Sequence, residues 1–314
     1  MKKVIMDVDT GIDDALAIMY GLESDALEFL GITTVDGNVP LDMVNRNTLK
    51  VLSMLGREDV PVFSGAAGPL MKPSRHVHHI HGEDGLGGAL IDYPYENMCE
   101  AQFAPDFIVE AARHHPGEVT LIAVGPLTNV ALAFKQEPLL GELLKEVVIM
   151  GGIVSRAGQG NSGPNSEFNI FTDAEAARIV IHGGANVTLV GLDVTKQAVL
   201  TARDIETLKG SKYYDFIKQS TEIYRTFSMD KFGLDGCALH DPLAVGFALN
   251  RGFLRTEHHY VDVDTVSPLN YGQTVCDFGG LWGEEPNVNV SLEVDSARFV
   301  EDFLNVMKNA SGKI

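Results

Sequence analysis

No run of apolar residues in this sequence approaches the roughly 20 that a membrane-spanning helix needs. An apolar signal-peptide core is also missing, because the acidic residues Asp7 and Asp9 follow almost at once after Lys2 and Lys3. These two absences predict a soluble cytoplasmic protein with no membrane partner.

Cysteine and basic residues are scarce as well. Three cysteines lie far apart without a CxxC pair, which argues against a disulfide framework and a thiolate zinc site. Lysine and arginine together number 24 against 43 aspartates and glutamates, for a formal net charge of −19. A surface that acidic repels phosphate backbones, so nucleic acid is not an expected partner, and an uncharged or cationic small ligand is favoured.

Internal repeats, low-complexity tracts and Ser/Pro-rich linkers are absent, so residues 1–314 are expected to form a single domain. Runs rich in Val, Ile and Leu alternate with segments of helical periodicity, as in βαβ units. This alternation predicts an α/β fold with an open, mostly parallel, Rossmann-like sheet flanked by helices. The expected strands are Lys3–Asp9, Leu27–Val35, Val119–Val124, Val147–Gly151, Asn186–Leu192 and His259–Val263.

The clearest expected helix spans Leu41–Leu55, because its apolar residues share one face between Pro40 and Gly56, which are typical of helix starts and ends. Two longer segments, Ala66–Tyr95 and Ser155–Asn169, are irregular and rich in glycine. Long loops inside an α/β domain are usually functional or mobile, and the first segment is the better candidate for a lid.

Four aspartates gather where the first expected strand meets the following helix: Asp7, Asp9, Asp13 and Asp14. Ligands of open parallel sheets bind at this carboxyl edge of the strands, so the active site is expected there. Helix capping explains Asp13 or Asp14, but not the addition of Asp7 and Asp9. Carboxylates this close repel one another unless a cation lies among them, and oxygen ligands favour calcium or magnesium over zinc.

Three other motifs fit this stretch poorly. An EF-hand counted from Asp7 would need an oxygen ligand at Gly11 and a glutamate at Ile18. A haloacid-dehalogenase-type phosphatase needs threonine or valine where Gly11 stands, and a dinucleotide-binding GxGxxG motif is absent.

The stretch from Asp7 to Ala15 resembles the N-terminal signature of the inosine–uridine nucleoside hydrolase family. Further family motifs recur in family order along nearly the whole chain: Gly37-Asn38, Ile80-His81-Gly82, Gly125-Pro126-Leu127-Thr128-Asn129, Met150-Gly151-Gly152, Glu167-Phe168-Asn169 and His240-Asp241-Pro242-Leu243-Ala244-Val245. The resemblance implies hydrolysis of the N-glycosidic bond of a ribonucleoside to ribose and free base, with uridine, cytidine and inosine as leading substrates. It also implies a homo-oligomer, either a tetramer or a dimer.

The resemblance further implies a Ca²⁺ site made by the carboxylates of Asp9, Asp14 and Asp241 and the backbone carbonyl of Val124. Asp9 would also be the general base that takes a proton from the attacking water, a role typically worth about 10²–10⁴-fold in rate. Water would attack the sugar directly, without a covalent ribosyl-enzyme intermediate.

By the same resemblance, the residues expected to contact the substrate are Asp13, Asn38, His81, Met150, Asn161, Glu167, Asn169 and His240. The acidic and amide side chains among them would hydrogen-bond the ribose hydroxyls, and Met150 would pack near the sugar or base. Glu167 and Asn169 lie two positions apart, so they can point to the same side of an extended segment.

His240 is the expected acid for the departing base, and His81 is expected nearby. An imidazole titrates near neutrality, so His240 would donate a proton without a large pKa shift. Alternatively, His240 only orients Asp241. The neighbouring histidines at 76, 78 and 79 are expected in the lid rather than in a zinc site. Phe232 stands where several pyrimidine-preferring members of the family have tyrosine, so no proton relay is assigned to that position.

Two other functions remain as alternatives. The first is a non-catalytic, calcium-dependent ribose or nucleoside binding protein. Asp9 and His240 argue against it, since binding alone needs neither a base nor an acid. The second is an Asp-based phosphatase, which Gly11 disfavours.

Overall fold

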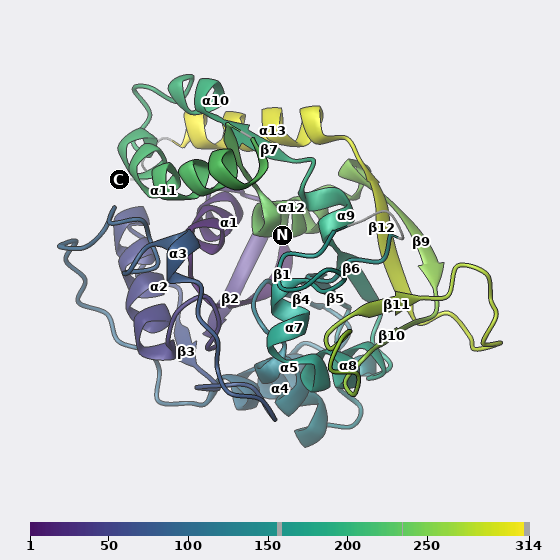
Figure 1. Cartoon of the computed structure of the whole chain (residues 1–314). Coiled ribbons are helices and arrows are strands. Elements are labelled where there is room, and N and C mark those ends of the chain that lie inside the picture. Colours follow the sequence, from purple (N-terminus) through teal and green to yellow (C-terminus); the bar gives the residue numbers. More distant parts are fainter. Residues whose placement is uncertain (156–158, 234, 311–314) are drawn as a thin grey trace.

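A computed structural model of the chain describes residues 1–155, 159–233 and 235–310. Its frame is an eight-stranded sheet with strand order β3-β2-β1-β4-β5-β6-β12-β9 (Figure 1). These strands are β1 Lys2–Val8, β2 Leu27–Thr34, β3 Val62–Ser64, β4 Val119–Ala123, β5 Glu146–Met150, β6 Val187–Val190, β9 Leu254–His259 and β12 Val288–Val294. Neighbouring strands are parallel except for β9, which runs antiparallel to β12. The predicted open, mostly parallel α/β sheet is confirmed.

Helices cover both faces of the sheet. One face carries α1 Ile12–Leu22, α2 Leu41–Leu55, α12 His240–Leu249 and α13 Ser296–Asn309, and the other carries α4 Ala104–His114, α5 Thr128–Gln136 and α8 Ala174–Ile181. The residues of β1 alternate between them, because Val4 and Met6 belong to the first buried cluster and Ile5 to the second. Strands buried on both faces therefore have continuous apolar runs.

The other helices and two small sheets complete the described chain. The remaining helices are α3 His78–His81, α6 Leu140–Leu143, α7 Phe168–Thr172, α9 Leu192–Thr195, α10 Ala202–Glu206, α11 Tyr214–Phe232 and a 3-10 turn at Arg251–Phe253. Two small antiparallel sheets pair β7 Val199–Thr201 with β8 Gly236–Ala238, and β10 Val261–Val263 with β11 Thr274–Cys276. None of the described helices is both long and apolar enough to span a membrane.

The order in which the chain adds strands reverses between β1 and β4, which makes this position a topological switch point. From β1 the chain winds outward through β2 to β3, and from β4 it winds the opposite way through β5 to β6. Open α/β sheets bind ligands outside the carboxyl ends of the strands at such a switch point. Asp9 follows β1 and Val124 follows β4, so both lie at this position.

Local sequence signals located most elements well. The helix at Leu41–Leu55 has the predicted bounds, and Gly56 ends it in the left-handed conformation with φ 67°. Five of the six expected strands match β1, β2, β4, β5 and β6 with small shifts at their ends. The segment Ala66–Tyr95 is irregular apart from the single turn α3, and residues 156–158 of the second expected loop lie outside the described residues.

The expected strand His259–Val263 is wrong as one continuous strand of the main sheet, although its residues 261–263 form β10. The chain passes from one sheet to another at Tyr260. β9 ends at His259 in the main sheet, whereas β10 begins at Val261 and pairs with β11. The side chain of Asn287 accepts a hydrogen bond from Val261 N–H at 2.8 Å and donates one to its carbonyl at 3.0 Å. These contacts occupy the backbone groups with which Val261 would continue the main sheet.

Candidate active site

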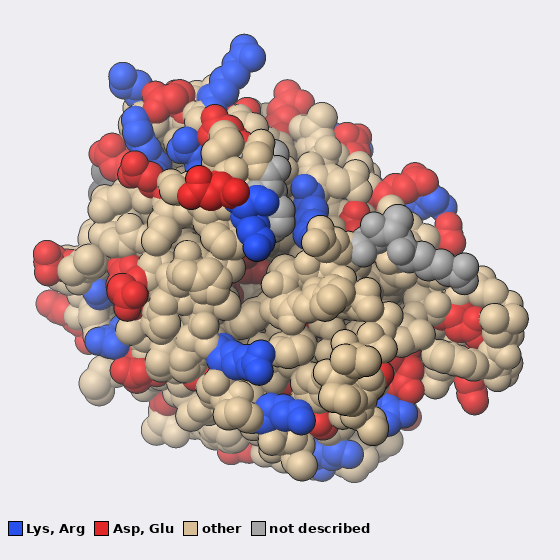
Figure 2. Space-filling model, viewed as in Figure 1, with Lys and Arg blue, Asp and Glu red and all other residues tan. Residues whose placement is uncertain are grey.

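A cavity of ≈ 1590 Å³ opens at the carboxyl ends of the central strands. Figure 2 shows a hollow near the centre of the corresponding face. Ten of the predicted site residues line the cavity: Asp13, Asn38, His81, Val124, Met150, Asn161, Glu167, Asn169, His240 and Asp241. The other two, Asp9 and Asp14, are buried and do not line it. The fold thus brings residues from most of the chain length to one place.

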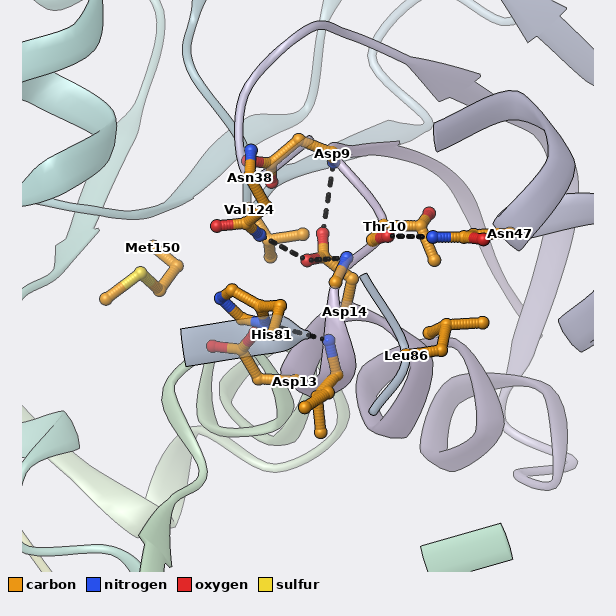
Figure 3. A network of polar contacts seen from close by, with 12 residues as sticks. Asp9, Thr10, Asp13, Asp14, Asn38, Asn47, His81, Leu86, Val124 and Met150 are labelled. Carbon is orange, nitrogen blue, oxygen red and sulfur yellow. Dashed lines mark hydrogen bonds and ion pairs between the residues drawn. The ribbon is translucent and has the colours of Figure 1, made fainter. Parts of the chain in front are cut away.

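Asp14 organises the turn between β1 and α1 (Figure 3). One carboxylate oxygen accepts the backbone N–H of Asp9 at 3.1 Å, and the other accepts the N–H of Gly11 at 2.9 Å. The amide of Asn38 donates a third hydrogen bond, at 3.1 Å. Asp14 therefore caps α1 as well as belonging to the acidic cluster.

Asp9 lies in a space that two glycines leave open. Its Oδ2 accepts the backbone N–H of Asn38 at 2.7 Å, whereas its Oδ1 is buried and has no hydrogen-bond partner among the described residues. A Cβ on Gly37 would lie 2.1 Å from Asp9 Oδ2, and one on Gly125 would lie 2.9 Å from Oδ1. The turns after β2 and β4 therefore need glycine for the Asp9 carboxylate to fit.

Asp7 departs from the expectation that all four aspartates crowd together around one cation. Its Oδ1 accepts hydrogen bonds from Thr33 Oγ1 at 2.5 Å and from Asn129 Nδ2 at 2.8 Å. Burial raises the Asp7 pKa to about 7. Asp7 does not line the cavity, so its contacts join β1 to β2 and α5 instead.

Three buried carboxylates meet at the floor of the cavity. Asp13, Asp14 and Asp241 each have an oxygen within 4.8 Å of the others. Burial raises the pKa of Asp13 to about 6, and burial with the neighbouring charge of Asp13 raises that of Asp14 to about 6. Burial and the nearby carboxylates also raise the pKa of Asp241. Uncompensated negative charge accumulates here when these groups ionise.

The unpartnered oxygens of this cluster fit a divalent cation. In the described part of the chain, Asp13 Oδ1 in the cluster and Asp9 Oδ1 beside it are both buried without a hydrogen-bond partner. Leaving such oxygens unpaired is costly, and a hard cation with oxygen ligands would compensate them. The clustered carboxylates are those of Asp13, Asp14 and Asp241, whereas the resemblance implied Asp9 in place of Asp13. The expected calcium ligands therefore remain a prediction.

Amide and carbonyl groups line the wall beside Val124 and Met150. Asn169 Nδ2 donates to the Val124 carbonyl at 2.7 Å and to the Met150 carbonyl at 3.2 Å. The Val124 carbonyl retains a second lone pair, because a backbone carbonyl accepts two hydrogen bonds. Asn161 is exposed on the loop that forms part of the cavity lining.

Glu167 caps α7, which corrects the expected extended conformation of residues 167–169. Its carboxylate accepts the N–H groups of Asn169 at 2.9 Å, Gly152 at 3.0 Å and Ile170 at 3.2 Å. Asn169 therefore belongs to a helix rather than to a strand-like segment, although both side chains line the cavity. Burial raises the Glu167 pKa to about 7.

His81 presents a defined tautomer to the cavity. Its Nδ1 accepts the backbone N–H of Ile12 at 3.0 Å, so Nδ1 is unprotonated and the ring proton lies on Nε2. Burial lowers the His81 pKa to about 4, so the ring is neutral at pH 7. Its position 3.9 Å from Asp13 Oδ1 places it beside the acidic cluster.

His240 differs from its expected near-neutral titration. Burial lowers the pKa of His240 to about 3, and the positive charge of Lys196 acts in the same direction. Its Nδ1 lies 2.7 Å from Thr195 Oγ1. His240 is therefore a neutral imidazole at pH 7, and any proton that it supplies comes from a neutral N–H group.

The predicted lid contributes several rings to the outer wall of the cavity. His76 Nε2 contacts Asp36 Oδ1 at 3.1 Å, and the ring of His79 packs edge-on against Phe227 of α11 with centroids 5.8 Å apart. Within the described part of the chain, the acidic cluster is the only group of at least three potential metal ligands whose ligand atoms all lie within 4.8 Å of one another.

Sequence reasoning missed several residues of the cavity. Tyr224 and Phe227 come from α11, and Lys196 follows α9. Thr195 holds His240, and Asn129 holds Asp7. Only the motif containing Asn129 gave a signal, because the others depend on how distant helices pack. The side chain of Phe232 lies outside the described residues.

The chain matches a known family over most of its length. Residues 4–301 match the family model described as inosine-uridine preferring nucleoside hydrolase. The pyrimidine-specific ribonucleoside hydrolase RihB of Escherichia coli (strain K12) is 36% identical over 300 residues, which cover 95% of this chain and 94% of that protein.

Solved structures agree with this match over the whole fold. A plant nucleoside hydrolase superposes with a TM-score of 0.92 at 32% identity, covering 98% of this chain and 99% of that one. A purine-preferring ribonucleoside hydrolase from Gardnerella vaginalis also has a TM-score of 0.92, at 33% identity and with the same coverage. The relatives differ in the base that their names specify.

Proposed function

Because this chain belongs to the inosine-uridine preferring nucleoside hydrolase family and is an N-glycosidase acting on ribonucleosides, we propose that its activity is calcium-dependent, with uridine, cytidine and inosine as leading substrates. The observation that carries the proposal is the buried cluster of Asp13, Asp14 and Asp241 at the floor of a cavity lined by amide groups. Such a cavity offers oxygen ligands to a cation and hydrogen bonds to a sugar.

Asp9, Asp14, Asp241 and the Val124 carbonyl would hold the calcium ion, with Asp13 beside them. When bound, calcium would supply a Lewis acid that activates a water molecule. Asp9 Oδ1, which has no hydrogen-bond partner among the described residues, would take the proton from the attacking water, while the backbone N–H of Asn38 fixes the other carboxylate oxygen. Hydrolysis then needs no covalent bond between the sugar and the protein.

Asp13, Asn38 and Asn169 would hold the sugar. Asn161 and Glu167, which precede Asn169 in the chain, would also contribute. Buried polar groups that lose their partner cost free energy, so a site of this kind rejects a substrate that lacks a hydroxyl. We therefore expect 2′-deoxyuridine to have a kcat/KM lower than that of uridine by about 10²-fold or more. Base release measured by chromatography checks this prediction. Comparable kcat/KM values would contradict the proposed ribose contacts.

The departing base would face His81 and His240. Hypoxanthine needs protonation as it leaves, whereas 4-nitrophenolate leaves as a stable anion, so His240→Ala should reduce inosine hydrolysis much more than hydrolysis of 4-nitrophenyl riboside. If His240 only orients Asp241, both substrates should lose rate by a similar factor. Steady-state rates with the two substrates separate these roles. Loss confined to inosine, with uridine unchanged, would direct attention to His81 for pyrimidines.

The test of the function itself is a nucleoside panel. Purified protein is incubated with uridine, cytidine and inosine, with and without a calcium chelator, and free base, reducing sugar and phosphate are measured. Base and ribose released in equal amounts, and only with calcium, are the expected result. A nucleoside-binding protein would bind uridine without releasing base. An Asp-based phosphatase would release no base from these nucleosides and would release phosphate from uridine monophosphate, which is included as a control.

We also propose an oligomeric state and a domain organisation for this protein. We expect a homo-oligomer, a tetramer or a dimer, and a single domain over residues 1–314. Light scattering coupled to size-exclusion chromatography measures the first. A single cooperative unfolding transition would support the second.

A further inference from the structure

Lys196 brings a positive charge to the side of the cavity where His240 lies. It directly follows α9 and lines the cavity together with His240 and Asp241. Thr195, the residue before it, holds His240 Nδ1 at 2.7 Å. The backbone that positions His240 therefore also positions the ammonium group of Lys196.

The hydrogen-bond partner of the ammonium group within the described chain is a backbone carbonyl rather than a carboxylate. Among the described residues, Lys196 takes part in no ion pair, and its Nζ donates a hydrogen bond to the Gln159 carbonyl. Asp193 is close enough for its charge to act on Lys196, but its two oxygens accept the N–H groups of Val154 at 2.9 Å and Ser155 at 2.8 Å. Lys196 is half-buried, and burial lowers its pKa. A partly desolvated cation of this kind favours an anion in the cavity.

Partial burial distinguishes Lys196 from the other lysine and arginine side chains that line the cavity. Arg75 and Lys231 also line it, but both are exposed. Figure 2 shows Lys and Arg side chains around the hollow on a protein whose net charge is −19. An exposed cation is screened by water and salt, whereas a half-buried one acts more strongly on a charge that develops nearby.

We propose that Lys196 stabilises the negative charge that the base acquires as it leaves, and that it thereby determines which bases this enzyme releases rapidly. The proposal rests on the proposed nucleoside hydrolase function. In the reaction the C1′–N bond breaks and its electron pair goes to the base nitrogen, while the water oxygen bonds to C1′ and gives a proton to Asp9. The departing base then takes up a proton from solvent or from a nearby N–H donor, so ribose and neutral base are the products. Lys196 contributes its fixed charge and transfers no proton.

Uridines substituted at C5 test this inference, because the substituent changes the acidity of the leaving base. Single-turnover rates are measured for 5-methyluridine, uridine, 5-fluorouridine and 5-nitrouridine, and their logarithms are plotted against the pKa of the free base. In Lys196→Met the slope should become steeper. The rate should fall by about tenfold or more for 5-methyluridine and much less for 5-nitrouridine, because a good anionic leaving group needs less stabilisation.

Matched variants separate the charge from a structural effect. Lys196→Arg keeps the charge and should restore most of the wild-type slope, whereas Lys196→Gln should behave like Lys196→Met. Lys209→Met, at an exposed lysine outside the cavity, changes the net charge equally and should leave the slope unchanged. Melting temperatures of all four variants confirm that they are folded.

The outcomes are distinguishable. An equal loss of rate for all four substrates, with the slope unchanged, would mean that Lys196 only holds the Gln159 carbonyl and would overturn the inference alone. The same slope change in Lys209→Met would also overturn it. If wild-type protein released no base from any nucleoside, the proposed function would fail first, and this inference with it.

Discussion

Replacing Asp9 with asparagine is expected to lower kcat for uridine by about 10²-fold or more while substrate still binds. Asparagine keeps the size of the side chain, and its carbonyl oxygen can still accept the backbone N–H of Asn38, which lies 2.7 Å from Asp9 Oδ2. The group that replaces the unpartnered Oδ1 cannot take a proton from water. Steady-state kcat and KM with uridine measure the effect.

Asp7→Asn is the matched control for this substitution. Asp7 lies two residues away and is equally buried, but it contacts Thr33 and Asn129 and does not line the cavity. We expect Asp7→Asn to lower the melting temperature, while its kcat stays much closer to the wild-type value than the kcat of Asp9→Asn does. Near wild-type kcat in Asp9→Asn would move the general base elsewhere, and Asp13 would be the next residue to substitute.

Removing calcium is expected to abolish activity and to lower the melting temperature. An ion that binds only the folded protein stabilises it by mass action, by about 2.7 kcal/mol when its concentration is 100 times Kd. Thermal unfolding of metal-free protein, with and without added calcium, measures this stabilisation independently of activity. Verified metal-free protein that hydrolyses uridine at an unchanged rate would contradict the calcium mechanism.

The size of the calcium effect should depend on pH. In the metal-free protein the pKa values of Asp13 and Asp14 are raised to about 6, so the folded state binds protons more tightly than the unfolded chain. The stability that these protonated carboxyls contribute is present below the ordinary aspartate pKa and is lost as pH rises through about 6. Calcium replaces the lost protons, so the gain in melting temperature should be larger at pH 8 than at pH 5. An equal gain at both values would show that these carboxylates do not bind the ion.

Elements with strong local signals were predictable from the sequence, whereas the edge of the sheet was not. The helix at 41–55 has both an amphipathic pattern and recognisable ends. β9 was missed because its residues from Leu254 to His259 are mostly polar, as suits a strand at the edge of a sheet. β12 does alternate, with Val288 and Val290 buried and Asn289 between them, so a signal for it was present.

The positions of the site residues were easier to predict than their environments. The motifs placed Asp13, Asn38 and Asp241 at the cavity because motif residues follow strand ends and begin helices. The low pKa of His240 and the partial burial of the Lys196 charge could not be predicted, because both result from tertiary packing. Residue type alone gives the ordinary pKa, and packing decides how far it moves.

The acidic cluster joins positions that are made at very different times during protein synthesis. Asp13 and Asp14 belong to the first helix, whereas Asp241 lies in the first turn of α12, which packs beside α1. A ribosome synthesises chains from the N-terminus, and a domain generally folds as a unit. The first acids therefore wait, without their third carboxylate, until more than two hundred further residues have been added. Under the proposed calcium mechanism, an ion could reach Asp241 and the acids of the first helix together only after α12 has docked, so its binding would report this docking rather than direct the earlier folding of the sheet.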